Sequence, residues 1–179
     1  MKVILIQPNY NLETDSQMAY TYVPYNFCIL GAMIRDMCEV KIIDAYQENY
    51  THEQLKEIIT KEEADVVGIT TLMDQSKRHG HKVAEIVKSI DKKITVVYGG
   101  VYVTMNPLVA IEDRNVDYFF LGEGEYTFPE LIKYLKGEGP FPKKGLMYRD
   151  KKTDEVINLG KSDFIKDLDE IPPPAYDLV

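Results

Sequence analysis

Short apolar runs alternate along the chain with longer segments of helical periodicity. Five runs are rich in β-branched and aromatic residues, as strands buried on both faces of a parallel sheet are; they cover residues 3–6, 40–43, 65–69, 94–98 and 116–121. The segments between them repeat apolar residues at the spacing of one helix face, for example Phe27, Leu30 and Ile34. This alternation predicts a flavodoxin-like (Rossmann-like), doubly wound α/β fold with a five-stranded parallel sheet in the order 2-1-3-4-5.

Capping signals mark where the helices begin. Two pairs have the spacing of a capping box: Thr51 with Gln54, and Thr127 with Glu130. Asn106 and Pro107 supply an N-cap and a first-position proline for a short helix. Together with helical patterns over residues 26–37 and 76–90, these signals predict five helices, one after each strand.

The pattern changes in the last part of the chain. Residues 145–149 and 156–159 flank a polar stretch, which predicts a small hairpin outside the main sheet. Three consecutive prolines at 172–174 stop both helix and strand, which indicates a linker. We therefore expect one domain over residues 1–139, followed by a hairpin and a Pro-rich linker over residues 140–179.

Composition excludes several classes of protein. The net charge of −8 argues against a nucleic-acid partner, and no apolar run approaches the roughly 20 residues of a membrane span. The N-terminal apolar run is too short for a signal peptide. Cys28 and Cys38 fall in one helical segment and cannot form a metal site alone, so we expect reduced core thiols in a cytoplasmic protein.

Small and hydroxyl-bearing residues follow three of the predicted strands. The three motifs are Thr70-Thr71-Leu72, Gly99-Gly100 and Gly122-Glu123-Gly124-Glu125. Ligands of open α/β sheets bind outside the carboxyl ends of the strands, so these motifs predict a floor for a large ligand. The first strand is followed by Gln7-Pro8-Asn9, with no glycine before Gly31, which argues against a phosphate loop or a dinucleotide fingerprint.

The segment after the first strand is unusually long for a compact domain. It reaches Pro24 and carries Tyr10, Tyr20 and Tyr22. Connections beyond about 12–15 residues are mostly functional or disordered. Both interpretations, a loop that covers the ligand and a partly disordered insertion, fit this segment.

The strand-end motifs resemble those of the cobalamin-binding domain shared by methionine synthase, the cobalamin-dependent mutases and cobalamin-dependent radical S-adenosylmethionine enzymes. In that family the third strand ends in Ser-x-Leu, similar to Thr70-Thr71-Leu72, and the fourth ends in Gly-Gly, similar to Gly99-Gly100. The mutase-type Asp-x-His-x-x-Gly motif is absent, because no histidine lies between Pro8 and Phe27. This absence narrows the resemblance to the radical branch.

Two further motifs resemble that branch, and the resemblance covers nearly the whole chain. Residues 99–107 look like its Gly-Gly-x-His-x-Thr segment with Tyr102 at the histidine position, and residues 122–125 look like its Gly-Glu-Gly-Glu signature. The acidic and Pro-rich stretch at 167–174 looks like the linker before the radical barrel. The resemblance implies a cobalamin-binding domain of a methyltransferase or related radical enzyme.

The resemblance also implies which residues bind cobalamin and which cofactors belong to another domain. Cobalamin would bind without a histidine ligand; the implied cofactor-binding residues are Pro8, Asn9, Thr70, Thr71, Leu72, Gly99, Gly100, Val101, Tyr102, Gly122, Glu123 and Gly124. The chain lacks the three-cysteine motif of a [4Fe-4S] cluster, so S-adenosylmethionine and the cluster would belong to a following radical barrel. The alternative is a flavodoxin-fold regulatory or interaction module without cofactor, which the missing histidine leaves open.

Several residues have two interpretations. Gly100 either leaves room for the cofactor, in which case we expect Gly100→Val to spare the apo fold and weaken binding at least tenfold, or adopts a positive φ in a turn. Glu123 and Glu125 are either an acid/base pair or carboxylates favoured by the dipole of the next helix. His79 and His81 point to different helix faces, and we expect both at the surface.

Overall fold

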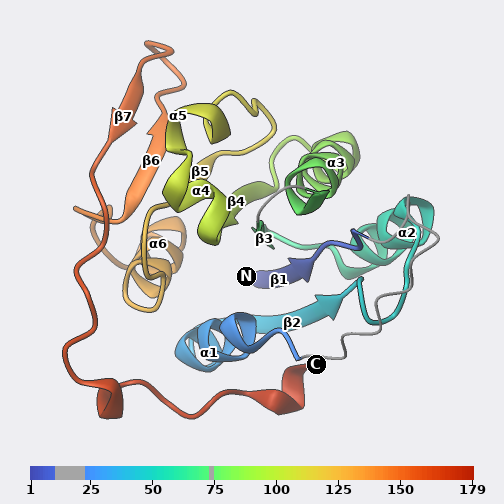
Figure 1. Ribbon diagram of the computed structural model, residues 1–179, viewed down its shortest axis with the longest axis horizontal. Coiled ribbons are helices and arrows are strands. Elements are labelled where there is room, and N and C mark those ends of the chain that lie inside the picture. The colour runs from blue at the N-terminus through green and yellow to red at the C-terminus, as the bar shows by residue number, and fades with distance from the viewer. Residues whose placement is uncertain (11–22, 73–74) are drawn as a thin grey trace.

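The computed structural model describes residues 1–10, 23–72 and 75–179, and within them one mixed sheet of seven strands runs in the order β2-β1-β3-β4-β5-β6-β7 (Figure 1). The strands are β1 (Lys2–Gln7), β2 (Glu39–Asp44), β3 (Val66–Thr70), β4 (Thr95–Gly99), β5 (Tyr118–Phe120), β6 (Leu146–Arg149) and β7 (Val156–Asn158). The first five pair in parallel, which confirms the predicted fold class and the order 2-1-3-4-5. The long segment after β1 lies, over residues 11–22, outside the described residues.

The predicted hairpin forms, but the expectation that it lies outside the main sheet is wrong. β6 pairs antiparallel with β5, with Phe119 opposite Met147 and Phe120 opposite Leu146. Both Leu146 and Met147 are fully buried, one on each face of the sheet. The hairpin therefore extends both apolar layers and covers the edge of β5, which would otherwise expose unpaired backbone groups.

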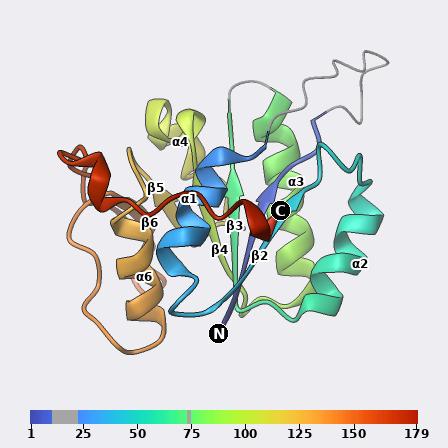
Figure 2. The same ribbon diagram turned by 90° about the horizontal axis from the view of Figure 1, so that it is seen from below.

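Helices cover both faces of the sheet (Figure 2). They are α1 (Tyr25–Ile34), α2 (His52–Glu62), α3 (Gln75–Ile90), α4 (Val101–Met105), α5 (Pro107–Ala110) and α6 (Thr127–Leu135). Apolar residues of α1 and α6 form one buried layer with the sheet, and those of α2, α3, α4 and α5 form the layer on the opposite face. Among the described residues, no helix combines the length and the apolarity that crossing a membrane requires.

The helix starts agree only in part with the capping signals. Thr51 and Gln54 form the predicted capping box, with both reciprocal hydrogen bonds present. The predicted box at Thr127 is wrong, since α6 has Tyr126 at its N-cap with no side-chain cap, and Thr127 is already buried within the helix. Pro107 begins α5 as expected, whereas α4, which starts directly after Gly100, was not predicted.

The last residues of the C-terminal segment, which covers residues 159–179, pack against the outer side of α1 (Figure 2). The backbone N–H of Ala175 donates to the carbonyl of Cys28 at 3.0 Å, and Arg35 makes two hydrogen bonds to the Asp177 carboxylate at 2.7 and 3.0 Å. Leu178 packs on the same apolar layer as α1. The Pro-rich stretch is thus fastened to the domain at its far end.

Both cysteines are free thiols, as the sequence predicted. Cys28 is fully buried under the C-terminal segment, and Cys38 is half-buried at the end of the turn after α1. Burial raises the pKa of both thiols, which favours the protonated and unreactive form.

Candidate functional site

The sheet lacks a side chain at one point on the face covered by α1 and α6. Gly68, in the middle of β3, lies in register between Leu5 of β1 and Val97 of β4. A Cβ atom at Gly68 would lie 2.7 Å from the Leu5 Cδ2 atom. A glycine inside a strand removes a side chain from the face of the sheet, and here the Leu5 side chain leans over the place that a side chain at residue 68 would take.

A pocket of about 390 Å³ extends from Gly68 to the carboxyl ends of β3, β4 and β5. Its floor and walls are apolar; they include Leu5, Val97 and Phe120 of the sheet, Phe27 of α1 and Phe128 of α6. Exposed Val101 and Met105 of α4 stand at its rim. The volume and the mainly apolar lining are typical of sites for small molecules and cofactors.

The two threonines at the end of β3 have different roles. The hydroxyl of Thr70 lines the pocket and accepts a hydrogen bond from the Asn26 amide at 3.2 Å, which leaves its own proton available to a ligand. The hydroxyl of Thr71 is buried and donates to the carbonyl of Gly99 at 3.0 Å. Thr70 therefore faces the ligand side, whereas Thr71 ties β3 to β4.

The two glycines at the end of β4 also differ. A Cβ atom at Gly99 would meet only the Phe120 Cβ within 4 Å, at 3.8 Å, so the protein fold itself does not require glycine there. Gly100 has φ +100°, and its Cβ would lie 2.5 Å from the Thr71 carbonyl oxygen. The expectation that Gly100→Val spares the apo fold is therefore wrong, because the added side chain would collide with the protein's own backbone.

The first half of the Gly-Glu-Gly-Glu motif joins the pocket to the C-terminal segment. Gly122 has φ +89°, and a Cβ there would lie 2.7 Å from the Ser162 hydroxyl oxygen. Its backbone N–H donates to the Thr104 hydroxyl at 3.0 Å. The Glu123 carboxylate accepts a hydrogen bond from the backbone N–H of Ile165 at 2.9 Å. The bond to Thr104 ties the pocket rim to α4, and the bond from Ile165 ties it to the segment that follows β7.

The second half of the motif faces α1. A Cβ atom at Gly124 would lie 3.5 Å from the Leu30 Cδ2, an ordinary contact distance. Glu125 lines the pocket, and its Oε2 is one of three buried side-chain N or O atoms that lack a hydrogen-bond partner in the described part of the chain. The carboxylate of Glu125 thus differs from that of Glu123, which is already engaged.

The pocket brings together seven of the twelve predicted cofactor-binding residues. The seven are Thr70, Gly99, Gly100, Val101, Gly122, Glu123 and Gly124. The other five, Pro8, Asn9, Thr71, Leu72 and Tyr102, do not line it. The Asn9 amide donates to the Asn49 side chain and to the Tyr50 carbonyl at 3.0 and 3.2 Å. The Tyr102 ring faces the Lys77 ammonium group, 5.5 Å from the ring centroid.

Five further residues line the pocket but were not among the predicted cofactor-binding residues: Asn26, Gly68, Thr104, Met105 and Glu125. Gly68 had a recognisable signal, since a glycine that interrupts a β-branched run often marks a close approach. Thr104 and Glu125 lie in motifs that the sequence already singled out, whereas Asn26 and Met105 carry no signal of their own. They reach the pocket only because α1 and α4 begin at the carboxyl edge of the sheet.

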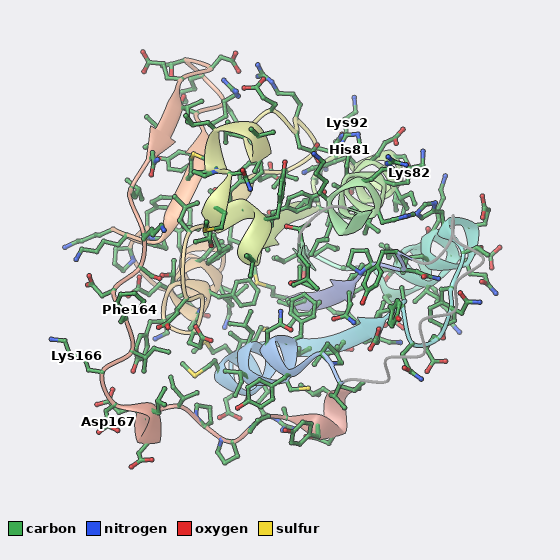
Figure 3. All side chains as sticks on the ribbon, in the orientation of Figure 1. His81, Lys82, Lys92, Phe164, Lys166 and Asp167 are labelled. Carbon is green, nitrogen blue, oxygen red and sulfur yellow. The ribbon has the colours of Figure 1, made fainter. Side chains whose placement is uncertain are left out.

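The histidines lie away from the pocket. The expectation that His79 is at the surface is wrong, because it is 3% exposed and its ring lies 5.6 Å from that of His52, where α3 packs on α2. His81 is exposed, as expected, on the outer side of α3 (Figure 3), and its Nδ1 lies 2.8 Å from an Asp113 carboxylate oxygen. No histidine of the described chain lines the pocket.

Known proteins with similar sequence or structure share this domain. The chain is 36% identical over its whole length to the uncharacterized methyltransferase PH0819 of Pyrococcus horikoshii, and it spans 39% of that protein. The cobalamin-dependent S-adenosylmethionine radical enzyme OxsB, with aqua-cobalamin and S-adenosylmethionine bound, superposes with a TM-score of 0.80 at 22% identity, over 99% of this chain and 24% of OxsB. The radical S-adenosylmethionine methyltransferase TsrM from Kitasatospora setae superposes with a TM-score of 0.73 at 18% identity, over 89% of this chain and 30% of TsrM.

A family model described as "B12 binding domain" matches residues 16–132, which include every strand of the parallel sheet except β1. The same residues contribute the whole pocket except Leu5. The match covers well over half of the chain, and it agrees with the whole-length similarity to PH0819. The chain belongs to the B12-binding domain family.

Proposed function

We propose that this chain binds cobalamin and that the nucleotide tail of the cofactor occupies the pocket above Gly68. The observation that carries the proposal is the pocket itself, a mainly apolar space of about 390 Å³ at the carboxyl edge of a parallel sheet, with Gly68 in its lining. The tail is a flat aromatic base on a sugar. Leu5, Val97 and Phe120 suit the base, and the Asn26 and Thr70 side chains offer polar partners for the sugar.

We propose further that no protein histidine binds the cobalt. When bound, cobalamin supplies a cobalt centre that can accept and release a methyl group. The protein's part is to hold the cofactor at the sheet edge, with Val101 and Met105 as an apolar rim. His79 is packed beside His52, and His81 is held by Asp113, which supports a histidine-free mode of binding.

The chain spans less than half of PH0819, and we propose that it is the amino-terminal cofactor domain of a longer radical S-adenosylmethionine enzyme, methyltransferase-like in its chemistry. Residues 1–139 would form the cobalamin unit, with the hairpin of β6 and β7 added to the edge of its sheet, and the rest of residues 140–179 would lead toward the radical barrel. That barrel would hold S-adenosylmethionine and the [4Fe-4S] cluster. The free cysteines support a reducing, cytoplasmic location. A parent protein without a three-cysteine cluster motif would contradict this placement.

Equilibrium dialysis of the chain against hydroxocobalamin tests the cofactor proposal. We expect uptake of one equivalent. We expect Gly99→Val to weaken binding by at least about tenfold while the apo protein keeps its stability, because residue 99 lines the pocket and its Cβ would contact only the Phe120 Cβ, at 3.8 Å. Gly137→Ala is a control. Gly137 has φ +76°, and a Cβ atom built there would have nothing within 4 Å, so the variant should be less stable but keep the pocket unchanged.

The outcomes separate the two candidate functions. Uptake by the wild type that Gly99→Val weakens and Gly137→Ala preserves supports the site. Absence of uptake would favour the flavodoxin-fold module without cofactor. If the wild type and a folded Gly99→Val variant bind hydroxocobalamin with equal affinity, the cofactor does not bind in this pocket.

A further inference from the structure

We propose that Glu125 is a ligand-binding residue of the pocket, whose carboxylate accepts a hydrogen bond from a hydroxyl or amide donor on bound cobalamin. The inference rests on the proposed function and deepens it. It assigns to Glu125 a role that the family match and the strand-end glycines leave open. The evidence is the contrast between the two carboxylates of one motif.

The first step is the state of the Glu125 side chain. Its Oε2 is buried and makes no hydrogen bond to the described part of the protein, although Glu125 lines the pocket. Buried polar atoms are nearly always partnered, and an unpartnered one in a native structure calls for an explanation. A donor supplied by a ligand in this pocket would provide the missing partner.

The second step is the contrast with Glu123. Both residues belong to the same short motif and both line the pocket. The Glu123 carboxylate accepts a hydrogen bond from the Ile165 backbone at 2.9 Å, so it serves to hold the C-terminal segment. Glu125 has no comparable bond from that segment, which leaves its carboxylate for the ligand.

The third step is the charge of the pocket. Two carboxylates and no lysine, arginine or histidine side chain line it within the described residues. Glu125 precedes Tyr126, the N-cap residue of α6. An anionic acceptor without a nearby cation favours neutral donors over a phosphate. Cobalamin carries such donors in two places, the ribose hydroxyl and the amides of the corrin ring.

The test compares Glu125→Leu with Glu130→Leu, which makes the same chemical change at an exposed position of α6. We expect Glu125→Leu to weaken hydroxocobalamin binding by at least about tenfold, or 1.4 kcal/mol, and to keep or raise the unfolding midpoint of the apo protein. Glu130→Leu should leave the affinity unchanged. A role of Glu125 in the fold alone would instead lower apo stability and spare the affinity.

Titration with cobinamide, which lacks the nucleotide, identifies the donor. If the Glu125 variant loses affinity for hydroxocobalamin but not for cobinamide, the ribose hydroxyl is the donor to Glu125. If it loses affinity equally for both ligands, the donor is a corrin amide. Glu125→Gln keeps the size of the side chain and replaces Glu125→Leu in the test if that variant does not fold. We expect Glu125→Gln to lower the affinity for hydroxocobalamin by at least about threefold. Unchanged affinity in a folded Glu125 variant overturns the inference, whereas absence of binding by the wild type overturns the proposed function.

Discussion

Gly100 lies against Thr71 so closely that a Cβ atom on Gly100 would come within 2.5 Å of the Thr71 carbonyl oxygen. That carbonyl cannot easily move, because it accepts the hydrogen bond from the Tyr102 backbone N–H at 3.2 Å, at the start of α4. The glycine at position 100 therefore allows the start of α4 to pack directly against the end of β3.

We expect Gly100→Ala to lower the free energy of unfolding of the apo protein by about 2 kcal/mol or more. The backbone at φ +100° and ψ −178° is accessible almost only to glycine, and the collision with Thr71 adds to that cost. Urea denaturation followed by circular dichroism measures the change. A midpoint equal to that of the wild type would contradict the geometry at this strand end.

The contact between Gly68 and Leu5 predicts non-additive substitutions. Gly68→Ala should cost about 1–3 kcal/mol, because its Cβ would lie 2.7 Å from the Leu5 Cδ2, and Leu5→Ala should cost about 2–5 kcal/mol. The double variant should lose less than the sum, by at least about 1 kcal/mol, since the shortened residue 5 makes room for the new methyl group. Additive losses in denaturant titrations would show that the two sites do not share this space.

The C-terminal segment should be held by apolar packing more than by its ion pair. Leu178 packs on the layer under α1, with its Cδ1 2.9 Å from the position that a Cβ of Gly31 would occupy. Leu178→Ala should cost roughly 1–2 kcal/mol. Asp177→Asn removes an exposed partner of Arg35 and should cost less, because water screens such pairs. Thermal melts of both variants show which one loses more stability. A larger loss for Asp177→Asn than for Leu178→Ala would contradict the prediction.

The acid limb of the stability curve should depend on Glu62. Hydrogen bonds from Lys2 and then Lys41 lower the pKa of Glu62 from 4.5 to about 2. A carboxylate with a lowered folded-state pKa contributes stability that is complete above its unfolded pKa and is lost as the pH falls through the folded pKa. This contribution should therefore disappear between pH 4.5 and about 2.

Glu62→Gln should flatten the loss of stability over that range and lower the stability at neutral pH. Glu57→Gln, at an exposed position of the same helix, provides the control and should leave the curve unchanged. Urea midpoints measured at a series of pH values give both curves. Parallel curves for the wild type and Glu62→Gln would mean that the Lys2–Glu62–Lys41 cluster does not set the acid limb.

The parallel core of the fold was predictable because its signals are local. Runs rich in β-branched and aromatic residues marked all five parallel strands, and Thr51 with Gln54 marked the start of α2. The place of the hairpin was not predictable in this way, since it depends on the open edge of β5 rather than on residues 146–158 themselves. α4 was missed because Val101, Val103 and Thr104 are β-branched and follow a glycine, a pattern that does not favour a helix.

The site was predictable at the strand ends and not beyond them. Thr70 and Gly99 lie at adjacent strand ends by the register of the sheet, so their neighbourhood follows from topology alone. The roles of Glu123 and Glu125 depend on where residues 159–179 fold back. The backbone N–H of Ile165 donates to the Glu123 carboxylate, whereas the Oε2 of Glu125 receives no hydrogen bond. Such a distinction requires tertiary structure.

The pocket floor is also part of the hydrophobic core: Leu5, Val97 and Phe120 belong to the buried layer under α1 and α6. A ligand seated on them fills a gap in the packing of the native state and has no equivalent place in the unfolded chain. At a concentration about 100-fold above its dissociation constant, such a ligand stabilises the folded protein by about 2.7 kcal/mol. Cellular abundance would then follow the supply of the ligand, since an unliganded chain spends more time open to proteases.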